Sequence, residues 1–408
     1  MKAVFFESLP YESAFKVGSH HYARRFVEAG FDVIWFSHPF SALHLIHPVR
    51  REIDVRWLGW RKGPYRTADD VLYYSPFTLL PSSNKPLLRS RPVVRNSVRL
   101  TVPPLMSVLR KEGFDKPDVI WLTNPSFQPI ASRIDAACRA VRIADAMADF
   151  AGVPEAIREL ESAAISSADV VFAVSEQEYA RVAAERNGVI RLPNGVDFAH
   201  FSRKCEEPER LSAIDHPRVI YVGALEYWFD AELVAEAARR SPEAQFVLIG
   251  PVRIPLDRLV GLDNVHILGS CPYEEIPAYM QHADVAIIPF VRDSMVDAIH
   301  PIKVYEYLAA GLPVLATRWT ELEAMNAPIT LTERDGFSGA LSEMLVEVGA
   351  SSASGTDAGG DPVRLARTQF ALANTWDARF QVVIEALGQF PSDCGEESLF
   401  VKNDKREP

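Results

Sequence analysis

A lysine in the first turn of a short predicted helix is the residue best placed for anion chemistry. The segment His300–Ala316 predicts a loop, a helix that starts at Pro301, and a core strand over Val314–Ala316. Pro301 suits a helix start because its missing N–H would have no partner there. Gly311 suits the left-handed end of that helix. Lys303 would then lie beside the free N–H groups of the helix, where a diphosphate can bind, although a solvated surface lysine fits the same pattern.

The sequence lacks the signatures of several common nucleotide and metal sites. It contains no G-x-G triplet, no G-K-[ST] loop, no H-E-x-x-H or C-x-x-C motif and no D-x-D pair. These absences argue against a dehydrogenase, a P-loop ATPase and a metalloenzyme. A diphosphate would therefore be held by backbone amides, helix ends and side chains, with no metal and no other cofactor.

Composition and length set the broad class of the protein. A chain of 408 residues is too long for one hydrophobic core, so we expect two domains. The net charge of −11 argues against a nucleic-acid partner. Four scattered cysteines, no recognisable signal peptide and no apolar run of about 20 residues predict a cytoplasmic protein.

Predicted strands and helices alternate along the chain, and the same pattern restarts near Val219. This order predicts an α/β fold with two doubly wound parallel-sheet, Rossmann-like domains, and ligands at the carboxyl ends of the strands. We expect domains over residues 1–205 and 206–375, a closing helix over 376–390 and a flexible polar tail over 391–408. A further strand is predicted over Ile53–Leu58.

A basic segment covers Lys85–Lys111 and combines seven lysines and arginines with many apolar residues and no acidic residue. This composition suits an anionic membrane surface or a phosphate-bearing lipid. A core helix with a solvated basic face is the alternative. Pro92, Pro103 and Pro104 interrupt any long helix there.

Several motifs, taken in their order along the chain, resemble those of GT-B nucleotide-sugar glycosyltransferases. They are Ser175-Glu-Gln-Glu, Pro193-Asn-Gly-Val-Asp197, Val222-Gly223, the block from Lys303 to Val314, and Trp376 at the start of the last helix. Within that family the sequence is most similar to the xanthan-type glucuronosyltransferases of bacterial exopolysaccharide biosynthesis. There, Arg142-Ile-Ala-Asp145 matches a motif whose aspartate serves as general base.

The resemblance implies an enzyme whose two domains face an interdomain cleft, with a C-terminal helix that crosses back to the first domain. It implies a UDP-sugar donor, with UDP-glucuronic acid as one candidate. The implied acceptor is a glycan or a lipid-diphosphate-linked glycan at the inner membrane face. Ile299 occupies the place of a glutamate that retaining members usually carry, so inversion is expected. A nucleotide-sugar 2-epimerase of the same fold and a non-catalytic sugar-nucleotide-binding protein remain as alternatives.

The predicted donor-side residues cluster in the second half of the chain. Those expected to hold the diphosphate and ribose are Lys303, Glu306, Gly223, Pro301 and Ile302; those for the nucleobase are Gly250, Cys271 and Tyr273; those for the donor sugar are Trp228 and His300. Solvated helix residues, strand-end turns and core packing are the structural alternatives.

The predicted acceptor-side residues lie in the first half of the chain. Asp145 follows a predicted strand, where a carboxylate could deprotonate an acceptor hydroxyl. An N-cap of the next helix is its alternative role. His20 and His21 begin the first helix, and because adjacent residues point in different directions, at most one is expected to face the acceptor.

Overall fold

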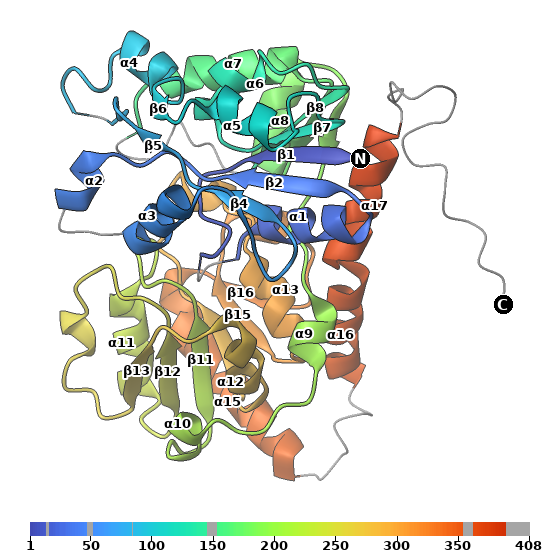
Figure 1. The fold of residues 1–408 in the computed structure, drawn as a ribbon. Coiled ribbons are helices and arrows are strands. Elements are labelled where there is room, and N and C mark those ends of the chain that lie inside the picture. The colour runs from blue at the N-terminus through green and yellow to red at the C-terminus, as the bar shows by residue number, and fades with distance from the viewer. Residues whose placement is uncertain (14–15, 47–51, 84, 145–152, 354–361, 389–408) are drawn as a thin grey trace. The chain divides into compact units, whose positions relative to one another are not determined.

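The computed structural model describes residues 1–408 except 14–15, 47–51, 84, 145–152, 354–361 and 389–408 (Figure 1). The chain forms two compact units. Unit 1 consists of Met1–Pro193 and Arg379–Pro408, and unit 2 of Asn194–Ala378. Each unit is built on one sheet covered by helices (Figure 1), which confirms the prediction of two Rossmann-like α/β domains. The predicted tail, 391–408, lies outside the described residues.

Unit 1 contains an eight-stranded sheet in the order β10-β9-β8-β7-β1-β2-β4-β3, parallel except for the β3–β4 pair. Its strands are β1 (Lys2–Phe6), β2 (Asp32–Phe36), β3 (Tyr65–Arg66), β4 (Leu72–Tyr74), β7 (Val119–Leu122), β8 (Cys138–Ile143), β9 (Val170–Ala173) and β10 (Val189–Arg191), and β5 (Phe77–Thr78) pairs separately with β6 (Thr101–Val102). Its helices are α1 (Gly18–Glu28), α2 (Ala42–Ile46), α3 (Ile53–Lys62), α4 (Arg91–Asn96), α5 (Leu105–Lys111), α6 (Gln128–Ala131), α7 (Ala156–Ser167) and α8 (Glu176–Glu185).

The segment predicted as a strand over Ile53–Leu58 is instead the start of α3. Ile53, Val55 and Trp57 alternate as they would in a strand, which misled the prediction. Helical spacing, however, also places Ile53, Trp57 and Trp60 on one face. The Trp60 indole packs at 5.2 Å from the Phe77 ring and donates a hydrogen bond to the Val102 carbonyl at 2.6 Å. Tertiary packing therefore selects the helix.

In the sheet of unit 1, β1 is the strand from which successive strands are added first on one side and then on the other. β2 lies on one side of β1, and β7 lies on the other. In open α/β sheets, ligands bind outside the carboxyl ends of the strands at such a switch point. The residues that follow β1, β2 and β7 are therefore candidates for a binding site in this unit.

Unit 2 contains six parallel strands in the order β13-β12-β11-β14-β15-β16. They are β11 (Arg218–Val222), β12 (Gln245–Ile249), β13 (Val265–Gly269), β14 (Val285–Ile288), β15 (Val314–Thr317) and β16 (Thr330–Thr332). The helices are α9 (Phe198–Ser202), α10 (Glu209–Ser212), α11 (Ala231–Arg240), α12 (Ile276–Gln281), α13 (Ile302–Ala309), α14 (Thr320–Ala324), α15 (Phe337–Ala353) and α16 (Pro362–Ala373). Every residue of β11, β14 and β15 is buried, as expected for strands covered on both faces. The switch point of this sheet lies between β11 and β14.

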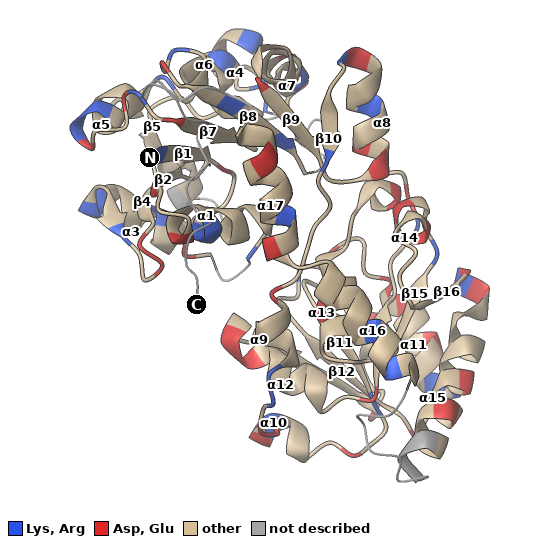
Figure 2. Ribbon diagram, turned by 90° about the vertical axis from the view of Figure 1, so that its right-hand side faces the viewer, with Lys and Arg blue, Asp and Glu red and all other residues tan. Residues whose placement is uncertain are grey.

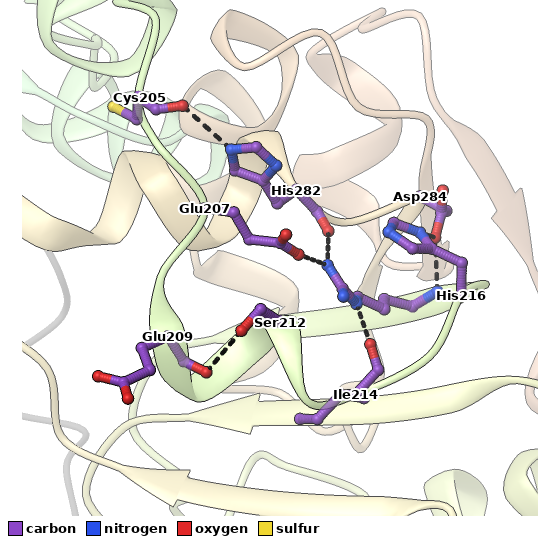
Figure 3. A network of polar contacts seen from close by, with 9 residues as sticks. Cys205, Glu207, Glu209, Ser212, Ile214, His216, His282 and Asp284 are labelled. Carbon is purple, nitrogen blue, oxygen red and sulfur yellow. Dashed lines mark hydrogen bonds and ion pairs between the residues drawn. The ribbon is translucent and has the colours of Figure 1, made fainter.

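The segment between β10 and β11 belongs to unit 2, so the division falls after Pro193 rather than at 205/206. Buried Arg218 ties this segment down by ion-pairing with Glu207 and donating hydrogen bonds to the carbonyls of Ile214 and His282 (Figure 3). The sequence alone could not predict this boundary, because Arg218 belongs to β11 and its side chain contacts residues of the preceding segment.

The last described helix, α17 (Trp376–Leu387), begins in unit 2 and ends in unit 1. At its start, the Trp376 N–H donates to the Val196 carbonyl at 3.1 Å. Further along, Phe380 packs edge-on against Phe26 of α1, with ring centroids 5.2 Å apart. The chain therefore returns to its first unit through this helix. Among the described residues, no helix has the length and apolar character needed to cross a bilayer.

Candidate functional site

The helix predicted to carry an anion site is present at the switch point of unit 2. α13 begins at Ile302 after an N-cap at Pro301, and Gly311 follows it with φ +83°. The backbone N–H of Val222, at the end of β11, donates to the Tyr307 hydroxyl at 2.8 Å. This bond holds the first turns of α13 against the carboxyl end of β11. The first N–H groups of the helix, which have no intrahelical acceptors, therefore lie at the switch point.

The Lys303 side chain lies over the backbone of Gly223, the residue that follows β11. A Cβ at Gly223 would stand 2.3 Å from Cε and 2.6 Å from Nζ of this lysine. The ammonium lies 5.7 Å from the Tyr221 ring centroid and 5.9 Å from that of Phe290, which follows β14. Burial lowers the pKa of Lys303, and the nearby Glu306 opposes that shift. Within the described part of the chain the ammonium has no hydrogen-bond or ion-pair partner, so a cation is available to an anionic ligand.

Glu306 lies one turn after Lys303 on the same helix. Burial raises its pKa to about 7, while the Lys303 charge acts in the opposite direction. Its carboxyl group makes no hydrogen bond to any described residue. Near neutral pH it can both accept and donate hydrogen bonds, which suits a ligand hydroxyl.

Gly223 and Gly250 follow neighbouring strands, since Val222 and Ile249 are paired in register. The Gly223 N–H donates to the Ile249 carbonyl, and the Gly250 N–H donates to the Gly269 carbonyl, both at 2.8 Å. A Cβ at Gly250 would stand 2.0 Å from the Gly223 carbonyl oxygen. Packing of the chain on itself thus already requires glycine at position 250, and its role toward a nucleobase stays a prediction.

His300 is held inside unit 2 rather than presented to a ligand. Its Nδ1 lies 2.6 Å from a Glu321 carboxylate oxygen, its Nε2 lies 2.8 Å from the Tyr305 hydroxyl, and the ring is buried. Its carbonyl accepts a hydrogen bond from the Asn194 side chain at 2.8 Å. These bonds do not support the predicted contact between the imidazole and the donor sugar. They fix the loop that precedes α13.

Three other predicted donor-side residues are half-buried in the same unit. The Tyr273 ring stacks on His200 with centroids 4.5 Å apart, so one face of this ring is already covered. Burial raises the pKa of the Cys271 thiol to about 11. Trp228 is half-buried, 6.4 Å from Phe290 between ring centroids. Their contacts with a nucleobase or sugar remain predictions.

The predicted acceptor-side residues have different outcomes. Asp145 lies outside the described residues. His20 is buried at the start of α1, where its Nδ1 accepts the Val17 N–H at 3.1 Å and its Nε2 donates to the Pro10 carbonyl at 3.0 Å. Burial lowers its pKa to about 4. His20 therefore caps the start of α1, and both of its ring nitrogens are already hydrogen-bonded, so neither is available to an acceptor sugar. His21 is buried too, and burial lowers its pKa well below the usual value.

The sequence reasoning missed a buried carboxyl group at the switch point of unit 1. Glu7 follows β1 and is 3% exposed, and it accepts a hydrogen bond from the Thr123 hydroxyl at 2.8 Å. Burial raises its pKa to about 8, against hydrogen bonds from Thr123 and Ser19 and the charge of Arg142. The available signal was a carboxylate directly after the apolar run Ala3–Phe6. Among the described residues, no cluster of three or more metal-ligating side chains is present.

Comparison with known proteins finds one family match and two sequence relatives that cover parts of this chain. The family described as "Glycosyl transferases group 1" matches residues 216–347. The chain is 28% identical over 182 residues to TuaH of Bacillus subtilis (strain 168), named as a teichuronic acid biosynthesis glycosyltransferase. It is 34% identical over 100 residues to the alpha-D-kanosaminyltransferase of Streptomyces kanamyceticus. These alignments cover 42% and 22% of this chain, and only 46% and 25% of the two relatives.

Solved structures agree in fold over nearly the whole chain. The sucrose-phosphate synthase of Thermosynechococcus elongatus superposes with a TM-score of 0.67 at 15% identity, covering 94% of this chain and 98% of the other. HepE of Anabaena, solved in complex with UDP, gives a TM-score of 0.63 at 15% identity over 95% and 100% of the two chains. The chain therefore has the GT-B fold, and its residues 216–347 match the family of group 1 glycosyl transferases.

Proposed function

We propose that this chain is a glycosyltransferase that moves a sugar from a nucleotide diphosphate sugar to a glycan or lipid-linked acceptor in bacterial polysaccharide biosynthesis. The observation that carries the proposal is the Lys303 ammonium, which lies over Gly223 at the switch point of unit 2 with no partner among the described residues. The domain match over 216–347 and the fold likeness to a UDP complex support a donor site in this unit.

The proposed donor chemistry uses charge rather than a metal ion. When the bond to the sugar breaks, negative charge develops on the leaving nucleoside diphosphate. Lys303 and the free N–H groups at Ile302 and its helical neighbours stabilise that charge electrostatically. Glu306 binds a ribose hydroxyl one turn further along. Pro301 contributes by starting the helix here.

The proposed acceptor chemistry rests on Asp145 as general base, from its resemblance to the motif of xanthan-type glucuronosyltransferases. The carboxylate would remove the acceptor proton as the oxygen attacks the anomeric carbon. A single displacement inverts that carbon, consistent with Ile299 in place of the usual glutamate of retaining members. UDP is the proposed nucleotide and UDP-glucuronic acid the first sugar to test.

The basic segment favours an acceptor at an anionic membrane surface. Figure 2 shows basic residues in α4 and α5. Leu79, 68% exposed, precedes the basic segment, and Leu87, 84% exposed, lies within it. Arg91 and Arg95 both approach Glu159 of α7, so part of their charge is balanced locally. We propose that this face of unit 1 binds anionic lipid, and flotation with liposomes of phosphatidylglycerol, compared with phosphatidylcholine alone, tests it.

The function is tested by incubating the protein with UDP- and GDP-sugars and a membrane lipid extract, and measuring nucleoside diphosphate release. Release that requires the extract supports transfer. Conversion of the donor to another sugar nucleotide without release supports the 2-epimerase. Donor binding with neither release nor conversion supports a non-catalytic sugar-nucleotide-binding protein.

A further inference from the structure

Three loops of unit 1 are tied together at the switch point of its sheet. They follow β1, β2 and β7 and contain Ser8, His38 and Asn124. Arg56 of α3 donates one hydrogen bond to the His38 carbonyl at 2.5 Å and another to the Ser8 carbonyl at 2.9 Å. The Asn124 side chain, 1% exposed, meets the His38 ring from the third loop at 3.2 Å. Arg56 therefore holds the backbone at His38, and Asn124 holds its imidazole.

The hydrogen bonds of Asn124 fix which ring nitrogen of His38 carries the proton. The Asn124 Oδ1 accepts the Ser126 N–H at 3.0 Å, so the amide NH2 group faces the imidazole. An NH2 group only donates, so His38 Nδ1 must accept. The ring proton of the neutral imidazole then resides on Nε2. Burial, Arg56 and His44 lower the pKa of His38 to about 3, which keeps the ring neutral.

The Nε2–H of His38 is not used by the described part of the protein. No hydrogen bond to this nitrogen exists among the described residues, and the side chain is only partly buried. Glu7 and Thr123, joined by their hydrogen bond of 2.8 Å, follow β1 and β7 at the same end of the sheet. The strands that precede Glu7 and Thr123 are β1 and β7, and β1 pairs with β2, the strand that precedes His38, so the three side chains follow adjacent strands.

We propose that His38 donates a hydrogen bond through Nε2–H to an oxygen of the acceptor sugar, with Glu7 and Thr123 completing a site for its hydroxyl groups. A neutral N–H suits a hydroxyl or ring oxygen, whereas a phosphate would favour a cation. Asn124 is the positioning residue for this imidazole, and Arg56 fixes the backbone of the loop that carries it. The inference rests on the proposed function, since it names the part of unit 1 that recognises the acceptor.

The test measures transfer from the active UDP-sugar to p-nitrophenyl glycosides of glucose, galactose, N-acetylglucosamine and glucuronic acid. His38→Ala should raise the acceptor KM about five- to tenfold, the worth of one hydrogen bond, and leave the donor KM unchanged. His38→Gln, which retains an N–H donor, should recover part of the loss. His216→Ala is the matched control, because this exposed histidine lies in unit 2 and bonds Asp284.

An equal acceptor KM in wild type and His38→Ala would overturn the inference, as would wild-type protein that binds none of the four glycosides. Nitrogen-15 NMR of the histidine side chains gives a readout separate from activity. It should show His38 protonated on Nε2, and Asn124→Asp should move that proton to Nδ1. A wild-type His38 protonated on Nδ1 would also overturn the inference. Failure of UDP binding, in contrast, counts against the proposed function alone.

Discussion

Lys303 crosses Gly223 so closely that a single added carbon at residue 223 would stand 2.3 Å from the lysine Cε. The glycine and the lysine lie 80 residues apart in sequence, at the end of β11 and in the first turn of α13. The glycine is required because it lets the ammonium reach the switch point between β11 and β14. Its φ of +152° adds a conformational reason.

Gly223→Ala should displace the lysine and weaken UDP binding about tenfold or more, because a charge-assisted hydrogen bond would be lost. Gly261→Ala is the matched control. Gly261 has φ +81° and no atom within 4 Å of an added Cβ, so it shares the backbone cost without the steric conflict. Equal UDP affinities for the two variants, measured by calorimetry, would show that the Lys303 position does not depend on Gly223.

Glu7→Gln should change how stability depends on pH. The Glu7 pKa is raised from 4.5 to about 8 in the folded protein, so between these values the unfolded chain releases a proton that the folded chain keeps. Wild-type stability therefore falls as pH rises from 4.5 to 8, and then levels off. Glu7→Gln has no carboxyl group that titrates at this position, so its stability should not fall in this way. At pH 8.5 its free energy of unfolding should exceed that of wild type by up to a few kcal/mol, at about 1.4 kcal/mol per pKa unit.

Unfolding in guanidinium chloride at pH 4.5, 6 and 8.5 measures the difference in free energy of unfolding between Glu7→Gln and wild type. Glu28→Gln serves as the control, because the Glu28 side chain is 52% exposed and pairs with Arg24 at the surface. A difference between Glu7→Gln and wild type that is constant with pH would contradict the raised pKa.

The buried pair between Glu321 and His300 should matter for stability rather than for sugar recognition. Glu321→Ala would remove the carboxylate that lies 2.6 Å from the buried His300 Nδ1, at a cost of about 2–3 kcal/mol. Glu323→Ala on the same helix removes an exposed pair with Arg318 and should cost less than about 1 kcal/mol. Thermal unfolding compares the two, and an equally small effect would show that the pair does not support the loop before α13.

Asp145→Asn should reduce transfer about 10²- to 10⁴-fold, the usual contribution of a general base, while UDP-sugar affinity stays the same. Release of UDP in the presence of acceptor measures the rate, and calorimetry measures affinity. Glu155→Gln, at the start of α7, is a control carboxylate nearby in sequence. Normal turnover in Asp145→Asn would mean that another group removes the proton.

Local patterns were sufficient to predict the fold and the donor-side helix. Prolines, glycines and apolar spacing near Lys303 are set by neighbours in sequence, and the structure places α13 and β15 as predicted. The acceptor side could not be predicted in the same way. Glu7 and Thr123 meet across 116 residues, and the hydrogen bonds that occupy His20 come from Pro10 and Val17. Two adjacent histidines suggested an acceptor site in the sequence, whereas in the structure His20 is buried and has a structural role.

The UDP affinity of Lys303→Ala, measured by isothermal titration calorimetry, tests whether this lysine holds the diphosphate. The comparison is with wild type and with Lys204→Ala, which removes an exposed lysine of the same unit. If Lys303 holds the diphosphate, its loss should weaken UDP binding at least about tenfold, while Lys204→Ala binds as wild type does. UDP affinity in Lys303→Ala equal to that of wild type would show that Lys303 does not bind the diphosphate and would make the start of α13 a purely structural element.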